Sequence, residues 1–359
     1  MGSRDKRMDV KPIIDKKIWD TWVAARKEHS FLQSWIWGEC NTELGDEALR
    51  VGLFDGERIV AVAQVLTIHA RRGTFYFIPH GPVCDEVATS DEKALFQIFE
   101  TLVQYLRKEA QTESKKQKRR ERISFIRFSP QLIDNPVLQS VFRKLSLRPA
   151  PMHMHAERSW LLDITPPEKT LLTNMRKANR YNIKKAEREG VIVTQGKNKN
   201  DIEQFHQLFE TFAEKKSFVA FSKNYVLSEY EHFARDNNIL LFIARHGDNI
   251  LAMAMIIFSG STAFYHQSLS TGLSPEKQGS YLMLWEAIRE AKKRGCVTFN
   301  FWGIAPQGDR KHPWAGLTFF KTGFGGYERN YIHAHDLPLT QRYWVNYIIE
   351  SVRRIKRGF

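Results

Sequence analysis

LFDGERIVAVA occupies residues 53–63 of this chain, and ARHGDNILAMA occupies residues 244–254. Four positions are identical at a constant offset (244 − 53 = 191), namely Gly56, Ile59, Ala61 and Ala63. Each glycine lies between two apolar runs, a pattern typical of a β-hairpin turn. The match therefore predicts two similar halves within one chain.

The same order of elements follows both hairpins. In the first half we expect a strand at 74–78, a helix at 90–110 and a strand at 123–129; in the second, 262–268, 278–294 and 297–304. Many α/β proteins contain strand, helix and strand in this order, but the aligned residues favour duplication. The predicted fold is α/β (α+β) with tandem domains at 1–150 and 151–337, a helix at 338–359 packed back on the first domain, and a site in a cleft between the domains.

The charge of the chain points to an anionic partner. Its 359 residues carry a formal net charge of +14 and a pI near 9.6, which favours RNA, nucleotide diphosphates or an anionic membrane face, although basic soluble proteins are also common. The three cysteines are too few and too scattered for a disulfide framework. The sequence shows neither an apolar leader nor a membrane span, so we expect a cytoplasmic protein.

A basic helix is expected at 171–189. Its cations recur at a spacing that places them along one side, at Arg176, Lys177, Arg180, Lys184 and Arg188. Like charges four residues apart repel one another on a helix, so an anion beside this face would stabilise it. A solvated helix face is the alternative, but a second basic run at 115–122 and the overall charge favour a polyanion.

Familiar catalytic motifs are absent from the sequence. It contains no GxSxG, HExxH, Walker A or dinucleotide-binding GxGxxG pattern. The pairs His153/His155 and His333/His335 have no acidic or thiol neighbours at metal-ligand spacing, so we expect no metal site.

One lysine stands out within an aromatic and glycine-rich segment. Lys321 is surrounded in sequence by Phe319, Phe320 and Phe324, and Gly303 follows Trp302 at the end of an expected strand. Such a lysine either extends to solvent or lies in a partly dry pocket, where its charge stabilises a developing anion far better than it could in water. The glycine would let a substrate approach the backbone.

Five collinear segments resemble the Fem-type aminoacyltransferases that build peptidoglycan interpeptide bridges. They are QSWIWG (33–38), PHGPV (79–83), NMRKANRYNIKKA (174–186), FWGI (301–304) and LTFFKTGFG (317–325). Each is weak alone, but the set covers nearly the whole chain in the right order. The interval 174–190 is too short for the paired-helix arm of some members, so the chain resembles the compact members without it.

The resemblance implies two tandem acetyltransferase-like (GNAT) domains and an aminoacyltransferase reaction. The donor would be aminoacyl-tRNA, with no further cofactor, and the basic helix would face the tRNA. The acceptor would be the stem-peptide amine of a cell-wall precursor, either UDP-MurNAc-pentapeptide or the lipid-linked form (lipid II). A lipid-linked acceptor would bring the protein to the inner membrane face as a peripheral partner.

Site residues follow from the matching positions. Lys321 corresponds to the lysine that is proposed in the family to stabilise the tetrahedral intermediate or the leaving end of the tRNA. The resemblance implies substrate contacts at Trp37, Arg127, Tyr225, Tyr265, Gln267, Trp302 and Phe320.

Three departures from the family pattern bear on the acceptor and on the mechanism. Asn41 and Phe221 replace two cations expected to bind phosphate, and Ser129 replaces an acid. We therefore favour the lipid-linked acceptor, with its anionic part bound by Arg71, Arg72 or Arg127. Because serine is no general base at neutral pH, the group that deprotonates the acceptor ammonium stays unassigned.

Two other functions compete with this interpretation. An acyl-CoA N-acyltransferase would share the fold and the chemistry, but PEKQGSY (275–281) does not match its pyrophosphate loop. A non-catalytic RNA- or membrane-associated protein would explain the charge, the basic run and the amphipathic C-terminal helix, but it leaves Lys321 without a role.

Overall fold

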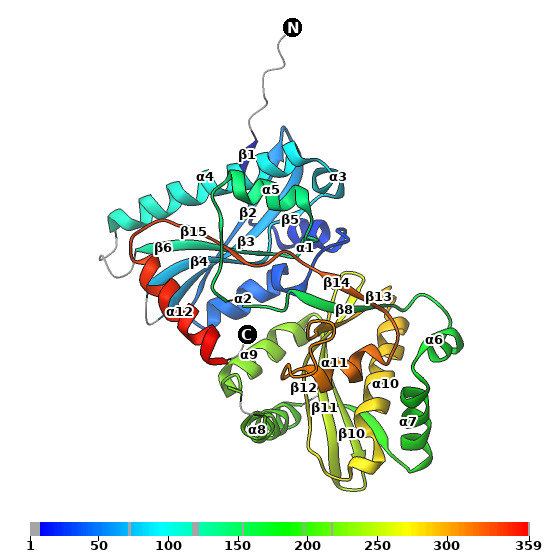
Figure 1. Cartoon of the computed structure of the whole chain (residues 1–359). Helices are drawn as coiled ribbons and strands as arrows, with labels where there is room; N and C mark the ends of the chain where they lie inside the picture. The colour runs from blue at the N-terminus through cyan, green and yellow to red at the C-terminus, as the bar shows by residue number, and fades with distance from the viewer. Residues whose placement is uncertain are drawn as a thin grey trace. The chain divides into compact units, whose positions relative to one another are not determined.

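The computed structural model describes residues 8–70, 73–116, 122–152, 154–196, 198–216 and 218–357 (Figure 1). It divides into two compact units, Met1–Glu157 with Asn330–Phe359, and Arg158–Arg329. The chain returns to the first unit before 337, because the strand β15 (His335–Pro338) pairs with β6 (Ile123–Pro130) of that unit. The predicted division at 150 and 337 therefore differs from the structural one at both junctions.

The first unit is built on a mixed sheet in the order β1-β2-β3-β4-β6-β15-β7, with β5 paired to β3. The remaining strands are β1 (Asp9–Pro12), β2 (Glu47–Asp55), β3 (Arg58–Ala70), β4 (Gly73–His80), β5 (Val83–Cys84) and β7 (Arg148–Pro149). Its helices are α1 (Lys16–Ala24), η1 (Phe31–Gln33), α2 (Trp35–Glu43), α3 (Glu86–Thr89), α4 (Glu92–Lys116), α5 (Pro136–Lys144) and α12 (Tyr343–Arg357).

Side chains of β4 alternate between two cores. Tyr76 and Ile78 join the main core beneath α4 and α5, whereas Phe75 and Phe77 pack with Tyr343 of α12 on the opposite face. This alternation is the period of two that a strand buried on both faces requires. The helix α12 thus packs on the sheet of the first unit.

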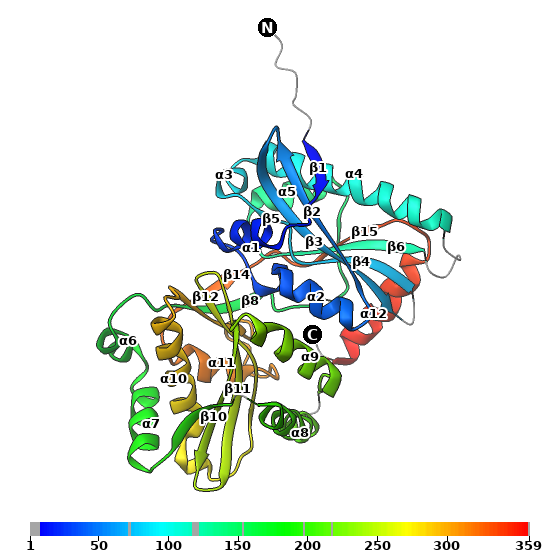
Figure 2. The same cartoon turned by 180° about the vertical axis from the view of Figure 1, so that it is seen from behind.

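The second unit has a seven-stranded sheet in the order β14-β8-β13-β12-β11-β10-β9. Its strands are β8 (Arg158–Asp163), β9 (Ile192–Gly196), β10 (Ile239–His246), β11 (Asn249–Ser259), β12 (Thr262–Ser270), β13 (Thr298–Gly303) and β14 (Tyr327–Asn330). Its helices are α6 (Glu168–Asn174), α7 (Lys177–Arg188), α8 (Lys199–Lys215), α9 (Lys223–Arg235), η2 (Pro275–Lys277), α10 (Gly279–Lys293) and α11 (Ala315–Thr322). The helices α7 and α10 cover one face of the sheet, and α8 and α9 cover the other (Figure 2).

The two hairpins share an irregularity as well as a sequence. The register of β2 with β3 shifts between Leu53 and Phe54, and that of β10 with β11 shifts between Ala244 and Arg245, which is the same repeat position (244 − 53 = 191). The turn glycines Gly56 and Gly247 both have positive φ, 65° and 55°. Sequence and backbone therefore agree that the halves are repeats.

The repeats differ where the two central parallel strands meet. In the first unit β4 and β6 pair from Thr74–Ile123 to His80–Pro130, with one register shift between Thr74 and Tyr76. In the second, the registered pairs of β12 with β13 end at Phe264–Asn300, although both strands continue. Beyond this point β12 and β13 form no further registered pair in the second unit.

The helix expected at 171–189 is interrupted. Met175 and Arg176 have extended backbone angles, so α6 ends before them and α7 begins after them. Neither proline nor glycine marks the break. Met175 is 3% exposed and belongs to the core of the second unit, so tertiary packing at this side chain outweighs the local helical pattern.

Candidate functional site

Lys321 is buried in the second unit. It lies on α11, is 4% exposed, and its Nζ donates a 2.7 Å hydrogen bond to the carbonyl oxygen of Gly303 at the end of β13. The same Nζ lies 5.8 Å from the ring centroid of Tyr265 on β12. The amine therefore contacts both strands beyond their last registered pair, and it does not extend into solvent.

Burial changes the acid–base behaviour of this group. It lowers the pKa of the Lys321 amine from its usual 10.5 to about 7, because the charged form loses hydration. Burial also raises the pKa of Tyr265 to about 12, so this phenol stays neutral at physiological pH. Lys321 can therefore exchange a proton near neutral pH, the range in which a general acid or base is most effective.

Trp302 marks strain next to this amine. Its φ is +65°, a value that bulky side chains rarely adopt, and its N–H donates a 2.8 Å hydrogen bond to Asn300 Oδ1. Strained backbone of this kind is concentrated at functional sites. The carbonyl that accepts from Lys321 belongs to the next residue, Gly303.

Aromatic rings hold α11 in place. Phe320 packs edge-to-face against Tyr281 of α10 and against Phe324, with centroid distances of 4.9 and 5.3 Å. Phe320 thus packs against the core rather than beside the amine of Lys321. Its structural role is to fix the helix that carries the lysine.

A buried polar cluster on the other strand face was not predicted as a whole. Glu229 of α9 is fully buried, and its two carboxylate oxygens lie 2.9 Å from His266 Nε2 and 2.7 Å from Gln267 Nε2, which donates to it. The residues Tyr265 and Gln267 pair with consecutive residues of β11, so His266 is the extra residue of a β-bulge. The His266 ring also packs edge-to-face on Trp302 at 6.0 Å.

Sequence reasoning found only Gln267 in this cluster. Glu229 is 37 residues from His266 in the chain, and no local motif joins them. The signal in the sequence was an acid between Val226 and Phe233 on one face of a helix, a pattern that a buried acid with a distant partner can produce.

Tyr225 lies in the first turn of α9, where its N–H donates to Oγ of the N-cap residue Ser222. Its ring stacks on Phe221, with a centroid distance of 4.6 Å and an interplanar angle of 18°. Phe221, at the position where the resemblance predicts a phosphate-binding arginine, thus forms a stacked aromatic pair with Tyr225.

The two predicted residues of the first unit are both buried. Trp37 on α2 is 5% exposed and packs edge-to-face on Phe31. Arg127 on β6 is 2% exposed and donates to Asp336 at 2.7 and 2.8 Å and to Glu350 at 2.8 Å. The structure corrects the assignment of Arg127, because two carboxylates of β15 and α12 already neutralise its guanidinium inside the unit.

The basic helix is also only partly available to an anion. Arg176 donates to the carbonyl oxygen of Phe319 at 2.9 Å and lies over its ring, and Arg180 donates to carbonyl oxygens at the end of α6. These two cations hold α7 against its neighbours, which corrects their expected role. Lys177, Lys184 and Arg188 are exposed.

Other predicted features fall outside the site. Arg71, Arg72, His153 and the centre of the basic run, 117–121, lie outside the described residues. His333 lies 2.6 Å from Glu157 Oε1 and 2.8 Å from the carbonyl oxygen of Ala150. Across the described residues, no group of three or more His, Cys, Asp or Glu side chains could hold a metal ion.

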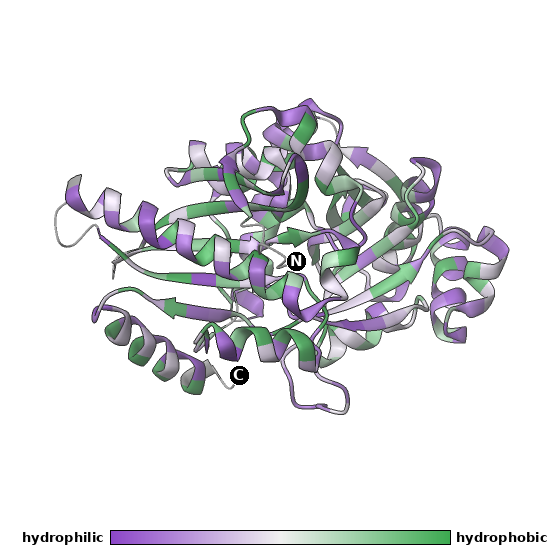
Figure 3. Ribbon diagram, turned by 90° about the horizontal axis from the view of Figure 1, so that it is seen from above, coloured by the Kyte–Doolittle hydropathy of each residue, from purple (hydrophilic) through white to green (hydrophobic). Residues whose placement is uncertain are grey.

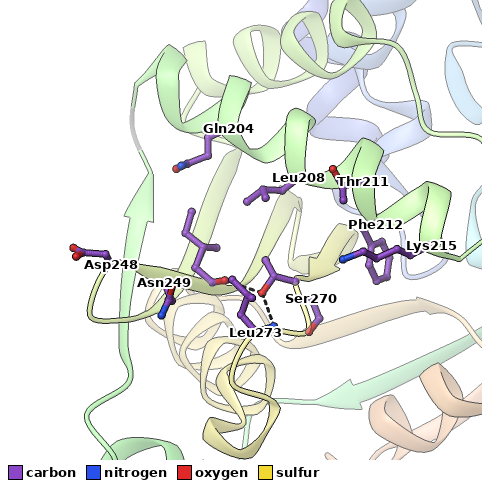
Figure 4. A pocket seen from close by; sticks show the side chains of 11 residues that line it. Gln204, Leu208, Thr211, Phe212, Lys215, Asp248, Asn249, Ser270 and Leu273 are labelled. Carbon is purple, nitrogen blue, oxygen red and sulfur yellow. Dashed lines mark hydrogen bonds between the residues drawn. The ribbon is translucent and has the colours of Figure 1, made fainter.

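A separate pocket of about 330 Å³ opens between α8 and the ends of β11 and β12. Leu208 and Phe212 of α8 point into it, with Asp248 and Lys215 at opposite ends (Figure 4). None of the predicted site residues lines it. The chemistry-bearing groups of the second unit therefore lie around β12, β13 and α11 instead.

A family model describes nearly the whole chain. The model of the FemAB family matches residues 14–140, 151–246 and 241–351. The chain belongs to the FemAB family. No curated protein sequence matches it.

Solved structures support the fold of this FemAB-family protein. A crystal structure of FemX superposes with a TM-score of 0.80 at 17% identity, covering 95% of this chain and 100% of that one. A tandem GNAT protein from the clavulanic acid biosynthesis pathway gives a TM-score of 0.55 at 8% identity, covering 92% and 98%. A conserved protein of unknown function from Bacteroides thetaiotaomicron gives 0.56 at 12%, covering 93% and 100%. The prediction of two GNAT-like domains is confirmed, and the protein is a transferase.

Proposed function

We propose that this FemAB-family transferase moves an amino acid from aminoacyl-tRNA to the stem-peptide amine of a peptidoglycan precursor. The observation that carries this proposal is the buried Lys321 amine beyond the last registered pair of β12 and β13. Acyl transfer from an ester to an amine needs a positive group next to the oxygen on which charge develops. A cation in a dry site serves this purpose far better than one in water.

The reaction balances with groups that this site supplies. The neutral acceptor amine attacks the ester carbonyl, a C–N bond forms, and the C–O bond to the terminal ribose of the tRNA breaks. The nitrogen that becomes the amide loses one proton and the leaving ribose oxygen gains one, so a group that donates the second proton is restored by the first. Lys321, with its pKa near 7, is suited both to stabilise the oxyanion and to donate that proton.

The lipid-linked precursor is the acceptor we favour. In the compact relatives that use the UDP-linked form, the resemblance predicts cations where this chain has Asn41 and Phe221. Asn41 is buried and donates to the carbonyl oxygen of Trp37 at 2.7 Å, and Phe221 stacks on Tyr225. Neither neutral side chain could bind a diphosphate as a cation does.

The experiment combines the purified protein with tRNA charged with radiolabelled amino acids. Lipid-linked precursor, UDP-linked precursor and a no-acceptor blank are compared, with acetyl-CoA as an alternative donor. Mass analysis should identify a precursor extended by an amino acid, with more product from the lipid-linked form. The proposal would be contradicted if only acetyl-CoA served as donor. It would also be contradicted if no acceptor gained an amino acid from the charged tRNA.

A further inference from the structure

The C-terminal helix α12 has a face that binds the first unit. Tyr343 is fully buried against Phe75, Phe77 and Phe125, and Asn346 is 7% exposed. Glu350, one helical turn further, accepts from Arg127. This side of the helix is therefore already occupied.

The opposite side of α12 is apolar and faces solvent. With 3.6 residues per turn, four side chains fall on one line along the helix, and Val345 lies beside them. We call them the α12 stripe: Trp344, Val345, Ile348, Val352 and Ile355, which are 37, 55, 61, 46 and 75% exposed. The hydropathy colouring shows green turns along this helix up to its C-terminal end (Figure 3). These apolar side chains are therefore not part of the face that packs on the first unit.

Cations lie near the α12 stripe. The Arg148 guanidinium lies 5.3 Å from the ring centroid of Trp344, and Arg353 and Arg354 are exposed on the last turns of the same helix. The acid of this helix, Glu350, is turned to Arg127 instead. The exposed surface thus combines an apolar line with positive charge.

We propose that the α12 stripe docks on an anionic lipid bilayer surface. An amphipathic helix lies in a membrane interface when its apolar side enters the acyl boundary and its cations stay at the anionic headgroups. Arg148 beside Trp344 and the exposed arginines on the last turns of α12 supply this positive charge. A second copy of the chain would bring the same arginines against each other, and a net charge of +14 opposes such pairing.

This inference rests on the proposed function in one respect, because surface docking would deliver the enzyme to a lipid-linked acceptor. No helix in the described part of the chain is long and apolar enough to span a bilayer, so the contact would be peripheral. The binding itself can be measured without any transfer reaction.

The test is flotation of the full-length protein with lipid vesicles. One set contains phosphatidylcholine alone, and the other also contains phosphatidylglycerol. We expect binding to the anionic vesicles, and about tenfold weaker binding for the triple variant Ile348→Ser, Val352→Ser, Ile355→Ser. The control replaces three comparably exposed apolar residues elsewhere, Ile14, Val87 and Val219, which are 88, 72 and 88% exposed, with serine and should bind like wild type.

Charge and oligomeric state give two further readouts. Arg353→Gln with Arg354→Gln should weaken binding to anionic vesicles and lower its sensitivity to salt. The inference is overturned if wild type floats with neither vesicle, if the stripe and control variants bind alike, or if light scattering shows a dimer that the stripe variant abolishes. Transfer to a UDP-linked or truncated, water-soluble acceptor should be unchanged in the stripe variant, whereas failure of the proposed function would abolish transfer to every acceptor.

Discussion

At the scale of single residues, the Lys321 amine is buried at a cost to stability. Its pKa in the folded protein is about 7, whereas in the unfolded chain it returns to about 10.5. Between these values the unfolded state binds more protons than the folded state, so stability rises with pH. Below pH 7 the full cost of burying the charge remains.

This behaviour predicts a pH-dependent difference between wild type and Lys321→Met. The variant lacks the buried charge and should be more stable at pH 7, by an amount that shrinks by about 1 kcal/mol per pH unit toward pH 10. Denaturant unfolding at several pH values measures both proteins. A difference that does not vary with pH would mean that Lys321 titrates normally.

His266 is the residue we expect to assist deprotonation of the acceptor. Glu229 holds the Nε2 side of the His266 ring, and the second ring nitrogen is of a type that can accept a proton, which a carboxamide lacks. His266→Gln can still donate to Glu229, so it should fold, but it should slow transfer about 10- to 100-fold with unchanged tRNA affinity. Rates across pH 6–9 check this; a variant with the wild-type pH profile and rate excludes His266 from proton transfer.

The sequence indicated Lys321 correctly as a charge in a partly dry site, because aromatic neighbours and a strand-end glycine signal such an environment. It did not show what Arg127, Arg176 and Arg180 contact within the fold. A sequence shows that a cation is present but not which carboxylate or carbonyl it meets after folding. For Arg127 the partners lie more than 200 residues away, at Asp336 and Glu350.

At the scale of elements, the break between α6 and α7 depends on Arg180. Its Nη1 donates to the carbonyl oxygens of Thr173 at 2.8 Å and Leu172 at 3.3 Å, and also to that of Met175. These carbonyls close α6, and helix ends need such partners. Local helical periodicity could not reveal this, since the break combines the burial of Met175 with a side chain, Arg180, that reaches back across it.

We therefore expect Arg180→Ala to affect mainly the stability of the fold and Lys184→Ala to affect mainly tRNA binding. Arg180→Ala should lower the free energy of unfolding by about 1–2 kcal/mol, because it leaves carbonyls without a charged donor. Lys184 is exposed, so its removal should change stability by less than about 0.5 kcal/mol and lower the salt slope of tRNA binding by about 1. Unfolding and binding titrations measure both; equal effects on stability would refute the distinction.

At the scale of the whole molecule, the two units differ in how the chain builds them. The second is continuous, Arg158–Arg329, whereas the first needs the C-terminal segment, because β15 lies between β6 and β7 in its sheet. The repeat predicted the shared hairpin, strand and helix order in both units. It could not predict β15, which has no counterpart in the repeat pattern that we detected.

Removal of residues 330–359 should therefore affect one unit selectively. The first unit loses β15, α12 and the partners of Arg127, leaving a buried charge uncompensated, so it should not fold. The second unit keeps its own core and should retain a cooperative thermal transition. Calorimetry and hydrogen exchange measure this; loss of protection in both units would show that the second depends on the first.

The most direct test of the central claim is the single-turnover rate of aminoacyl transfer by Lys321→Met. Methionine fills the same space without charge, and Lys293→Met serves as a control that removes an exposed lysine of the same unit outside the basic helix. We predict a rate about 100- to 1000-fold below wild type for Lys321→Met, with tRNA affinity nearly unchanged, and a near-normal rate for the control. A Lys321→Met rate within about threefold of wild type would contradict the role of this amine in the reaction.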